Sequence, residues 1–131
     1  MQKEAMEAML MIFGEIGEPT LKPLGELSNE MRAMGEMFQN TTDDSIYNTK
    51  HCTEKRHAVC QTLYANLLLV LHFVQPAWMG AASLYMVTNV MSFGLTPTSV
   101  IAFAFYGGTL AAIGQYESAC RLGTISRFHL C

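Results

Sequence analysis

Charged residues are missing from the middle of this 131-residue sequence, where residues 58–116 include no Asp, Glu, Lys or Arg. The whole chain has only eight Lys and Arg against eleven Asp and Glu, and the basic residues form no cluster. Because binding to a phosphate backbone needs clustered positive charge, this pattern argues against nucleic acid as a partner. The scarcity of charge does not indicate disorder, since half of the residues are hydrophobic and can form a core.

Cysteine occurs at four positions, which show no paired short spacing. The first ten residues, MQKEAMEAML, mix acidic and basic side chains, unlike the basic and then apolar build of a secretory signal. We therefore expect a cytoplasmic protein whose cysteines stay reduced.

Histidine and cysteine come close together in one stretch, and both residue types can bind zinc. The residues are His51, Cys52, His57 and Cys60. Their spacing argues against zinc, because seven residues separate the two cysteines and no second pair follows. His72 falls within an apolar helix and is expected in the core or in a groove. Motifs of kinases, ATPases and dinucleotide-binding proteins are absent. We predict no catalytic, cofactor-binding or metal-binding residues and no enzyme activity.

Apolar residues recur at helical spacing in segments 1–13 and 27–38, with charged residues on the other faces. Glycine and proline interrupt the pattern between them. We predict a pair of amphipathic helices over residues 1–39. Residues 40–51 are rich in turn formers and lack periodicity, which predicts an exposed polar linker.

Methionines and acidic residues in this first part have ordinary structural interpretations. The methionines fit either an adaptable binding surface or core packing, and Met31 and Met34 share the stripe that must be buried, which favours the core. Glu18 and Asp43 fall in predicted loops, where we expect solvated charges without fixed partners.

Four further helices are predicted in the rest of the chain. The third ends before Pro76, the fourth ends at Gly94, and the sixth follows Gly114, because proline suits a helix start and glycine a helix end. Thr96 and Pro97 are predicted to open the fifth helix. Short connections favour antiparallel neighbours, and no segment has the alternation of a strand. The sequence therefore predicts an all-α fold of about six helices arranged as hairpins.

The segment FAFYGGTLAAIGQYESACRLGTIS, which begins at Phe103, resembles a tetratricopeptide repeat. The positions that match the family are Phe103, Tyr106, Gly107, Leu110, Ala119 and Ser126. Small residues let two helices pack closely, and glycine inside a helix costs about 1 kcal/mol relative to alanine. We therefore predict a packing role for Gly107 and Gly108. Residues 52–131 are predicted to be stacked tetratricopeptide-like hairpins.

The stretch 75–123 is similar to the helical region that follows the ATPase module in large multidomain sensor kinases. The resemblance implies a non-catalytic scaffold segment of a signal-transduction protein, which binds a protein partner or neighbouring domains of the same parent. It also implies further repeats after residue 131, so we expect a truncated piece whose last helix can self-associate.

Membrane insertion is the alternative, because a bilayer span needs only about 20 apolar residues and the uncharged middle is longer. Against it, the apolar segment 63–74 is short, and the next helix carries several polar residues. The third apolar segment contains Gly107 and Gly108 and reaches only from Val100 to Ile113. The loops also lack the Lys and Arg asymmetry that orients membrane proteins. We expect the uncharged helices to be buried by protein neighbours, with a fragment of a multi-pass membrane protein as the alternative.

Overall fold

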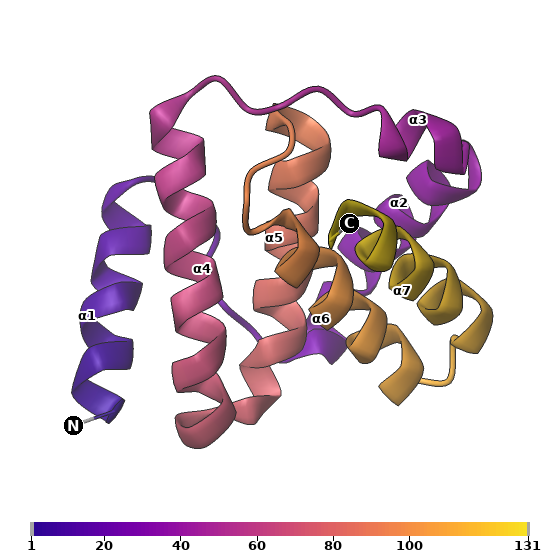
Figure 1. Ribbon diagram of the computed structural model, residues 1–131. Helices are drawn as coiled ribbons and strands as arrows, with labels where there is room; N and C mark the ends of the chain where they lie inside the picture. The colour runs from indigo at the N-terminus through magenta and orange to yellow at the C-terminus, as the bar shows by residue number, and fades with distance from the viewer. Residues whose placement is uncertain (1, 131) are drawn as a thin grey trace.

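The computed structural model describes residues 2–130, with side chains up to residue 127, and this part of the chain is helical without a strand (Figure 1). The prediction of an all-α fold built from helix hairpins is confirmed. Two short 3₁₀ turns each lead directly into a longer helix. The elements are α1 (Gln2–Glu15), η1 (Leu24–Leu27), α2 (Ser28–Gln39), α3 (Asp43–Tyr47), α4 (Lys55–Val74), η2 (Pro76–Trp78), α5 (Met79–Phe93), α6 (Ser99–Ala112) and α7 (Tyr116–Leu130).

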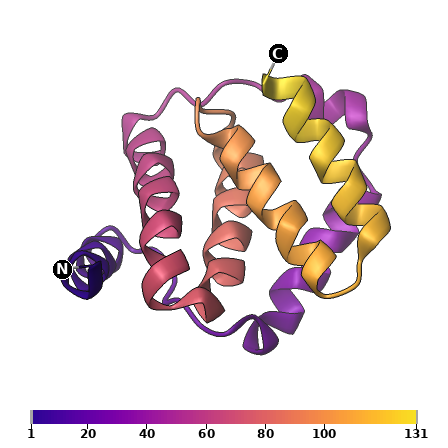
Figure 2. The ribbon, with the colours of Figure 1, turned by 60° about the horizontal axis from the view of Figure 1, so that its bottom comes forward.

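Helices α4 to α7 form the body of the molecule, in which each helix packs antiparallel against the next along the chain (Figures 1 and 2). The central helix α5 is buried on nearly all sides, and the consecutive residues 81–87 are all inaccessible to solvent or nearly so. A helix enclosed in this way has no face on which a charge can stay hydrated. Burial by protein neighbours thus accounts for the missing charges in α5.

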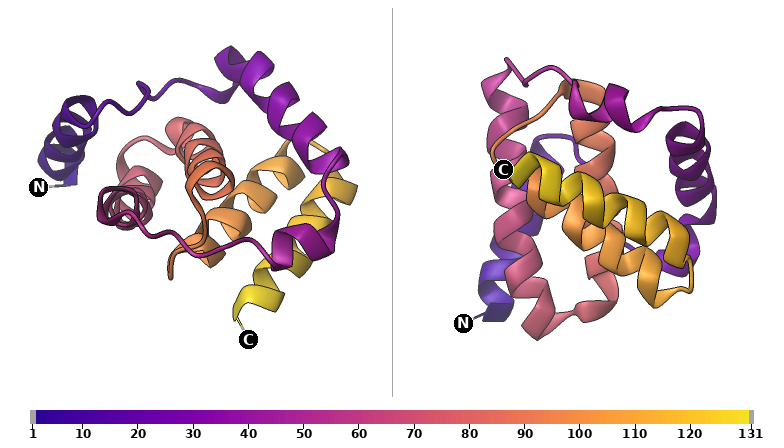
Figure 3. Two further views of the ribbon diagram at one scale, coloured as in Figure 1. Left: turned by 90° about the horizontal axis from the view of Figure 1, so that it is seen from above. Right: turned by 45° about the vertical axis from the view of Figure 1, so that its right-hand side comes forward.

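Helices α1 and α2 lie apart, which corrects the predicted pairing within residues 1–39. Helix α1 packs along α4, where the Phe13 and Tyr64 rings lie 4.3 Å apart between centroids. Helix α2 lies on another side of the body, next to α6 and α7 (Figure 3). Both helices bury an apolar stripe as expected, with Phe13 of α1 and Phe38 of α2 in the core. Each stripe packs on the body, and the two helices do not pack on each other. Periodicity identifies the buried face of a helix and not its neighbour.

The segment predicted as a polar linker, residues 40–51, contains α3, which corrects that prediction. Thr42 is its N-cap, since the backbone N–H of Ser45 donates to Thr42 Oγ1 at 3.1 Å. Asp43 lies in the first turn, where negative charge is favourable, and Ile46 is fully buried. One short turn with a single buried residue is too brief to show helical periodicity.

Gly94 ends α5, as predicted, and the structure adds a second reason for glycine at this position. Its φ is +110°, a region that side chains disfavour, and a Cβ there would lie 2.6 Å from the carbonyl oxygen of Lys50. The close approach arises because Leu95 N–H donates to Lys50 O at 2.9 Å and Cys52 N–H donates to Leu95 O at 2.7 Å. Gly94 thus joins the end of the 40–51 segment to the body.

Helix α6 begins at Ser99, later than the predicted start at Thr96 and Pro97. The backbone N–H of Thr96 donates to Ser99 Oγ at 2.8 Å, so the side chain that stabilises this turn belongs to Ser99. The third predicted helix ends before Pro76, as expected, since α4 ends at Val74. The predicted helix end at Gly114, whose φ is +87°, also agrees with the structure.

Candidate functional site

Gly107 lies at the contact between α6 and α7. A Cβ at Gly107 would lie 3.4 Å from Leu122 Cβ and 3.5 Å from the carbonyl oxygen of Ala119, so its predicted packing role is confirmed. The same prediction for Gly108 is wrong, because no atom lies within 4 Å of a Cβ at that position. The hairpin α6–α7 is therefore a tightly packed wall whose outer surface includes Gly108.

A groove with a volume of about 560 Å³ separates α2 from this wall. We call it the α2 groove. Its apolar side chains come from both walls, and they are Met31, Phe38, Tyr106, Leu110, Ile113 and Leu122. Polar residues also line it, namely Ser28, Gln39, Gln115 and Ser118, together with the charged Arg32, Glu36 and Arg121. Its size falls within the range of roughly 300 to 1,000 Å³ that is typical of ligand sites. Burial raises the pKa of Tyr106 to about 12, so the phenol in this groove is neutral.

Arg121 ties α7 to the segment between α2 and α3. Its Nε lies 2.6 Å from Asp43 Oδ1, and its two terminal nitrogens donate to the carbonyl oxygens of Phe38 and Thr41, each at 2.5 Å. The guanidinium carbon also lies 5.9 Å from the centre of the Phe38 ring. Cationic hydrogen bonds to the last carbonyls of a helix stabilise that end. This contact fixes one end of the α2 groove and uses the charge of Arg121.

Arg32 and Glu36 carry the charges of the α2 groove that have no partner. They lie one turn apart on α2, both are exposed, and neither forms an ion pair or a side-chain hydrogen bond within the part of the chain that the structure describes. A molecule that enters the groove therefore meets one free positive and one free negative charge beside an apolar floor.

A second groove, of about 550 Å³, runs between η2, α5 and α6, and we call it the α5–α6 groove. It contains no charged residue, and its lining is mostly apolar or small. Phe105 and Ile113 are 37% and 47% exposed there, and Gly108 forms part of its surface. The two grooves differ in chemistry although they share α6.

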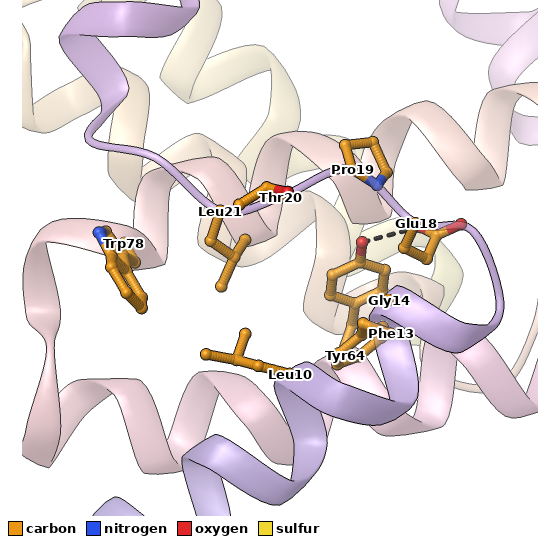
Figure 4. Close-up of a pocket in the computed structure, with 9 residues that line it drawn as sticks. All are labelled: Leu10, Phe13, Gly14, Glu18, Pro19, Thr20, Leu21, Tyr64 and Trp78. Carbon is orange, nitrogen blue, oxygen red and sulfur yellow. Dashed lines mark hydrogen bonds between the residues drawn. The ribbon is translucent and has the colours of Figure 1, made fainter.

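Glu18 anchors the connection after α1 to α4 and α5. Its Oε1 accepts a hydrogen bond from Tyr64 Oη at 2.7 Å (Figure 4). It also accepts one from Asn89 Nδ2 at 3.0 Å. Beside this contact lies a cavity of about 120 Å³, whose lining includes Leu10 and Trp78. The prediction of a solvated Glu18 without a fixed partner is thus wrong, and the same holds for Asp43.

Burial beside Glu18 raises the pKa of two neighbouring side chains. Burial, reinforced by Glu18, raises the pKa of the Tyr64 phenol well above its ordinary value. Burial and the same carboxylate raise the pKa of the Cys60 thiol to about 12. Because the thiolate is the reactive form of cysteine, Cys60 is a poor nucleophile near neutral pH. These residues act as packing and hydrogen-bonding groups.

The histidines and cysteines between residues 51 and 60 do not converge. The His57 ring stacks on Phe93 with centroids 3.4 Å apart, whereas Cys60 is buried near Glu18. Among the described residues no group of three His, Cys, Asp or Glu side chains could hold a metal ion. His72 is exposed at the edge of Phe73, so its predicted position in the core or a groove is wrong.

The sequence offered no signal for Arg32, Glu36 or Arg121 as groove residues, because they share a site only after α2 is placed beside α7. Comparison with known proteins found no family model, no curated protein and no solved structure that matches this chain. The fold and the site define an all-helical protein with an open, partly charged groove.

Proposed function

We propose that this chain is a non-catalytic protein-interaction module that binds a helical segment in the α2 groove. The segment belongs to another protein or to a neighbouring domain of the same parent. The observation that carries the proposal is the α2 groove itself, with apolar side chains on both walls and polar residues around them. Recognition of an amphipathic helix needs this combination, because the apolar face of the helix enters a hydrophobic groove and its flanks stay in contact with polar groups.

The proposal extends to a scaffold role in a cytoplasmic signalling protein. It is supported by the resemblance of the 103–126 segment to a tetratricopeptide repeat and by the close contact of α6 with α7 at Gly107. Stacked helix pairs form stiff surfaces that can hold two domains in a fixed relation. The resemblance of residues 75–123 to the helical region of sensor kinases also supports a place in a signalling protein.

Two glycines allow a matched test of the α2 groove. Gly35 on α2 and Gly108 on α6 each have open space where a Cβ would lie, and each lines a different groove. Leucine at either position should leave the fold intact, since leucine favours helix more than glycine does. Gly35→Leu fills the α2 groove, and Gly108→Leu fills the α5–α6 groove.

The probe is a displayed library of helical peptides about four turns long, with leucines on one face and variable flanks. Peptides selected on the full chain should lose at least tenfold in affinity for Gly35→Leu and keep wild-type affinity for Gly108→Leu, as measured by fluorescence anisotropy. Recovery of no binding peptide, or equal binding to Gly35→Leu, contradicts the proposal.

Membrane embedding is the second candidate, favoured by α4. Within the described part of the chain, this helix of 20 residues is the one that is long and apolar enough to span a membrane. Of its most apolar stretch of 18 residues, 33% is buried inside the protein. Leu69 and Phe73 on α4 are 63% and 68% exposed. This candidate predicts that the expressed chain resists carbonate extraction from membranes, whereas an interaction module is released.

A further inference from the structure

The charged residues of the α2 groove narrow the kind of helix that fits it. Three charged side chains line the groove, and Arg121 is already bound to Asp43 and to two backbone carbonyl groups. Arg32 and Glu36 remain, on the α2 wall, without partners in the described residues. They set the electrostatic preference of the site for its occupant.

The spacing of the two charges matches the repeat of an α-helix. Residues four apart on a helix lie on the same face, one turn from each other. Arg32 and Glu36 have this separation on α2, so a helix lying along α2 presents its own residues at the same interval. A carboxylate on that helix can face Arg32 while an ammonium or guanidinium group one turn away faces Glu36.

The apolar floor fixes which face of the occupant enters. Tyr106, Leu110 and Leu122 are buried on the α6–α7 wall, and Phe38 is buried on the α2 wall. The occupant therefore directs an apolar stripe toward these residues. Its charged residues lie on the flank beside α2, where they stay partly hydrated.

Resting on the proposed function, we propose that the α2 groove takes an amphipathic helix with one acidic and one basic residue a single turn apart on the α2-facing flank. The acidic residue pairs with Arg32 and the basic residue pairs with Glu36. Reversing the two charges places like charges side by side, which is repulsive. For a helix that lies in one direction along α2, the groove therefore selects the order of the charges as well as the apolar stripe.

A charge-swapped protein, with Arg32→Glu and Glu36→Arg together, tests this inference. Both positions are exposed on α2, and the swap keeps the net charge, so thermal melting should match that of the wild type. The peptide library has a constant leucine face, with Glu, Lys and Gln varied on its flanks, and it is selected separately on the two proteins.

Wild type should select one order of acidic and basic residues, and the charge-swapped protein should select the opposite order. Each selected peptide should bind its own protein about three- to tenfold more tightly than the other protein at low salt, with a smaller ratio at high salt. Peptides that bind in the α2 groove, shown by their sensitivity to Gly35→Leu, but carry no charge order would overturn this inference and leave the proposed function standing. Absence of any groove-binding peptide would overturn both.

Discussion

The body formed by α4 to α7 and the segment from residue 16 to residue 54, which we call the wrapping segment, are organised differently. In the body each helix packs against its neighbour in sequence. The wrapping segment contains η1, α2 and α3, and it is tied to the body through Glu18 at one end and Asp43 near the other. Apolar contacts between adjacent helices thus build the body. The wrapping segment also buries apolar residues, Phe38 and Ile46 among them, and polar contacts over long sequence distances tie it to the body. The α2 groove is the space between these two parts.

The largest expected effect comes from Gly94→Ala, which breaks the junction between the two parts. The added Cβ meets the carbonyl oxygen of Lys50 and forces a residue other than glycine to adopt a positive φ. We expect a loss of about 3 kcal/mol or more in the free energy of unfolding. Urea denaturation followed by circular dichroism measures it, and a loss below about 1 kcal/mol would show that the junction is not rigid.

Arg121→Ala should have the next largest effect on the free energy of unfolding. It removes the ion pair with Asp43 and leaves the carbonyl groups of Phe38 and Thr41 without this donor. We expect a loss of about 2 to 3 kcal/mol, because hydrogen bonds to charged groups are the stronger ones. Arg127→Ala is the matched control on the same helix, at an exposed position, and should cost less than about 0.5 kcal/mol. Equal losses in the two variants would mean that Arg121 does not hold the wrapping segment.

Within the body, Gly107→Leu tests the contact between α6 and α7. The larger side chain must displace Leu122 or the backbone at Ala119, so we expect a loss of about 1 to 3 kcal/mol from overpacking. Gly108→Leu, at the next position on the helix, should be neutral or stabilising by up to about 1 kcal/mol. Thermal melting compares the two, and identical melting temperatures would contradict the observed register.

The smallest effect is a pH dependence that arises from Cys60. Its pKa is raised in the folded protein to about 12, from an ordinary value of 9.0. The unfolded chain therefore loses this proton first, and stability that is present below pH 9 is lost as the pH rises toward 12. Wild type should lose about 1 kcal/mol more than Cys60→Ala between pH 8 and about pH 9.7. Parallel pH profiles for the two proteins would show that Cys60 makes no such contribution.

The body was largely predictable from the sequence, because its signals are local. Pro76, Gly94 and Gly114 mark helix ends, and the small residue Gly107 marks a close helix contact. These features act on residues nearby in the chain or in the next helix. Gly108 shows the limit of such reasoning, because its sequence context resembles that of Gly107 although its Cβ position is open.

The wrapping segment and the α2 groove were not predictable, because their determinants are far apart in sequence. Glu18 accepts from Asn89, and Asp43 pairs with Arg121, in each case across most of the chain. An acidic residue in a loop has the same local pattern whether it is solvated or bound to such a partner. The helix α3 is too short to show a period, and apolar stripes on α1 and α2 do not reveal which helix covers them.

The most direct test of the central claim is a titration of the isotope-labelled protein with the tightest selected helical peptide, followed by amide NMR shifts. The account predicts that the largest shifts fall on α2, around Gly35, and on the facing residues Leu110 and Leu122, while the amide of Gly108 changes little. Shifts concentrated around Gly108 and Phe105, with α2 unaffected, would contradict it.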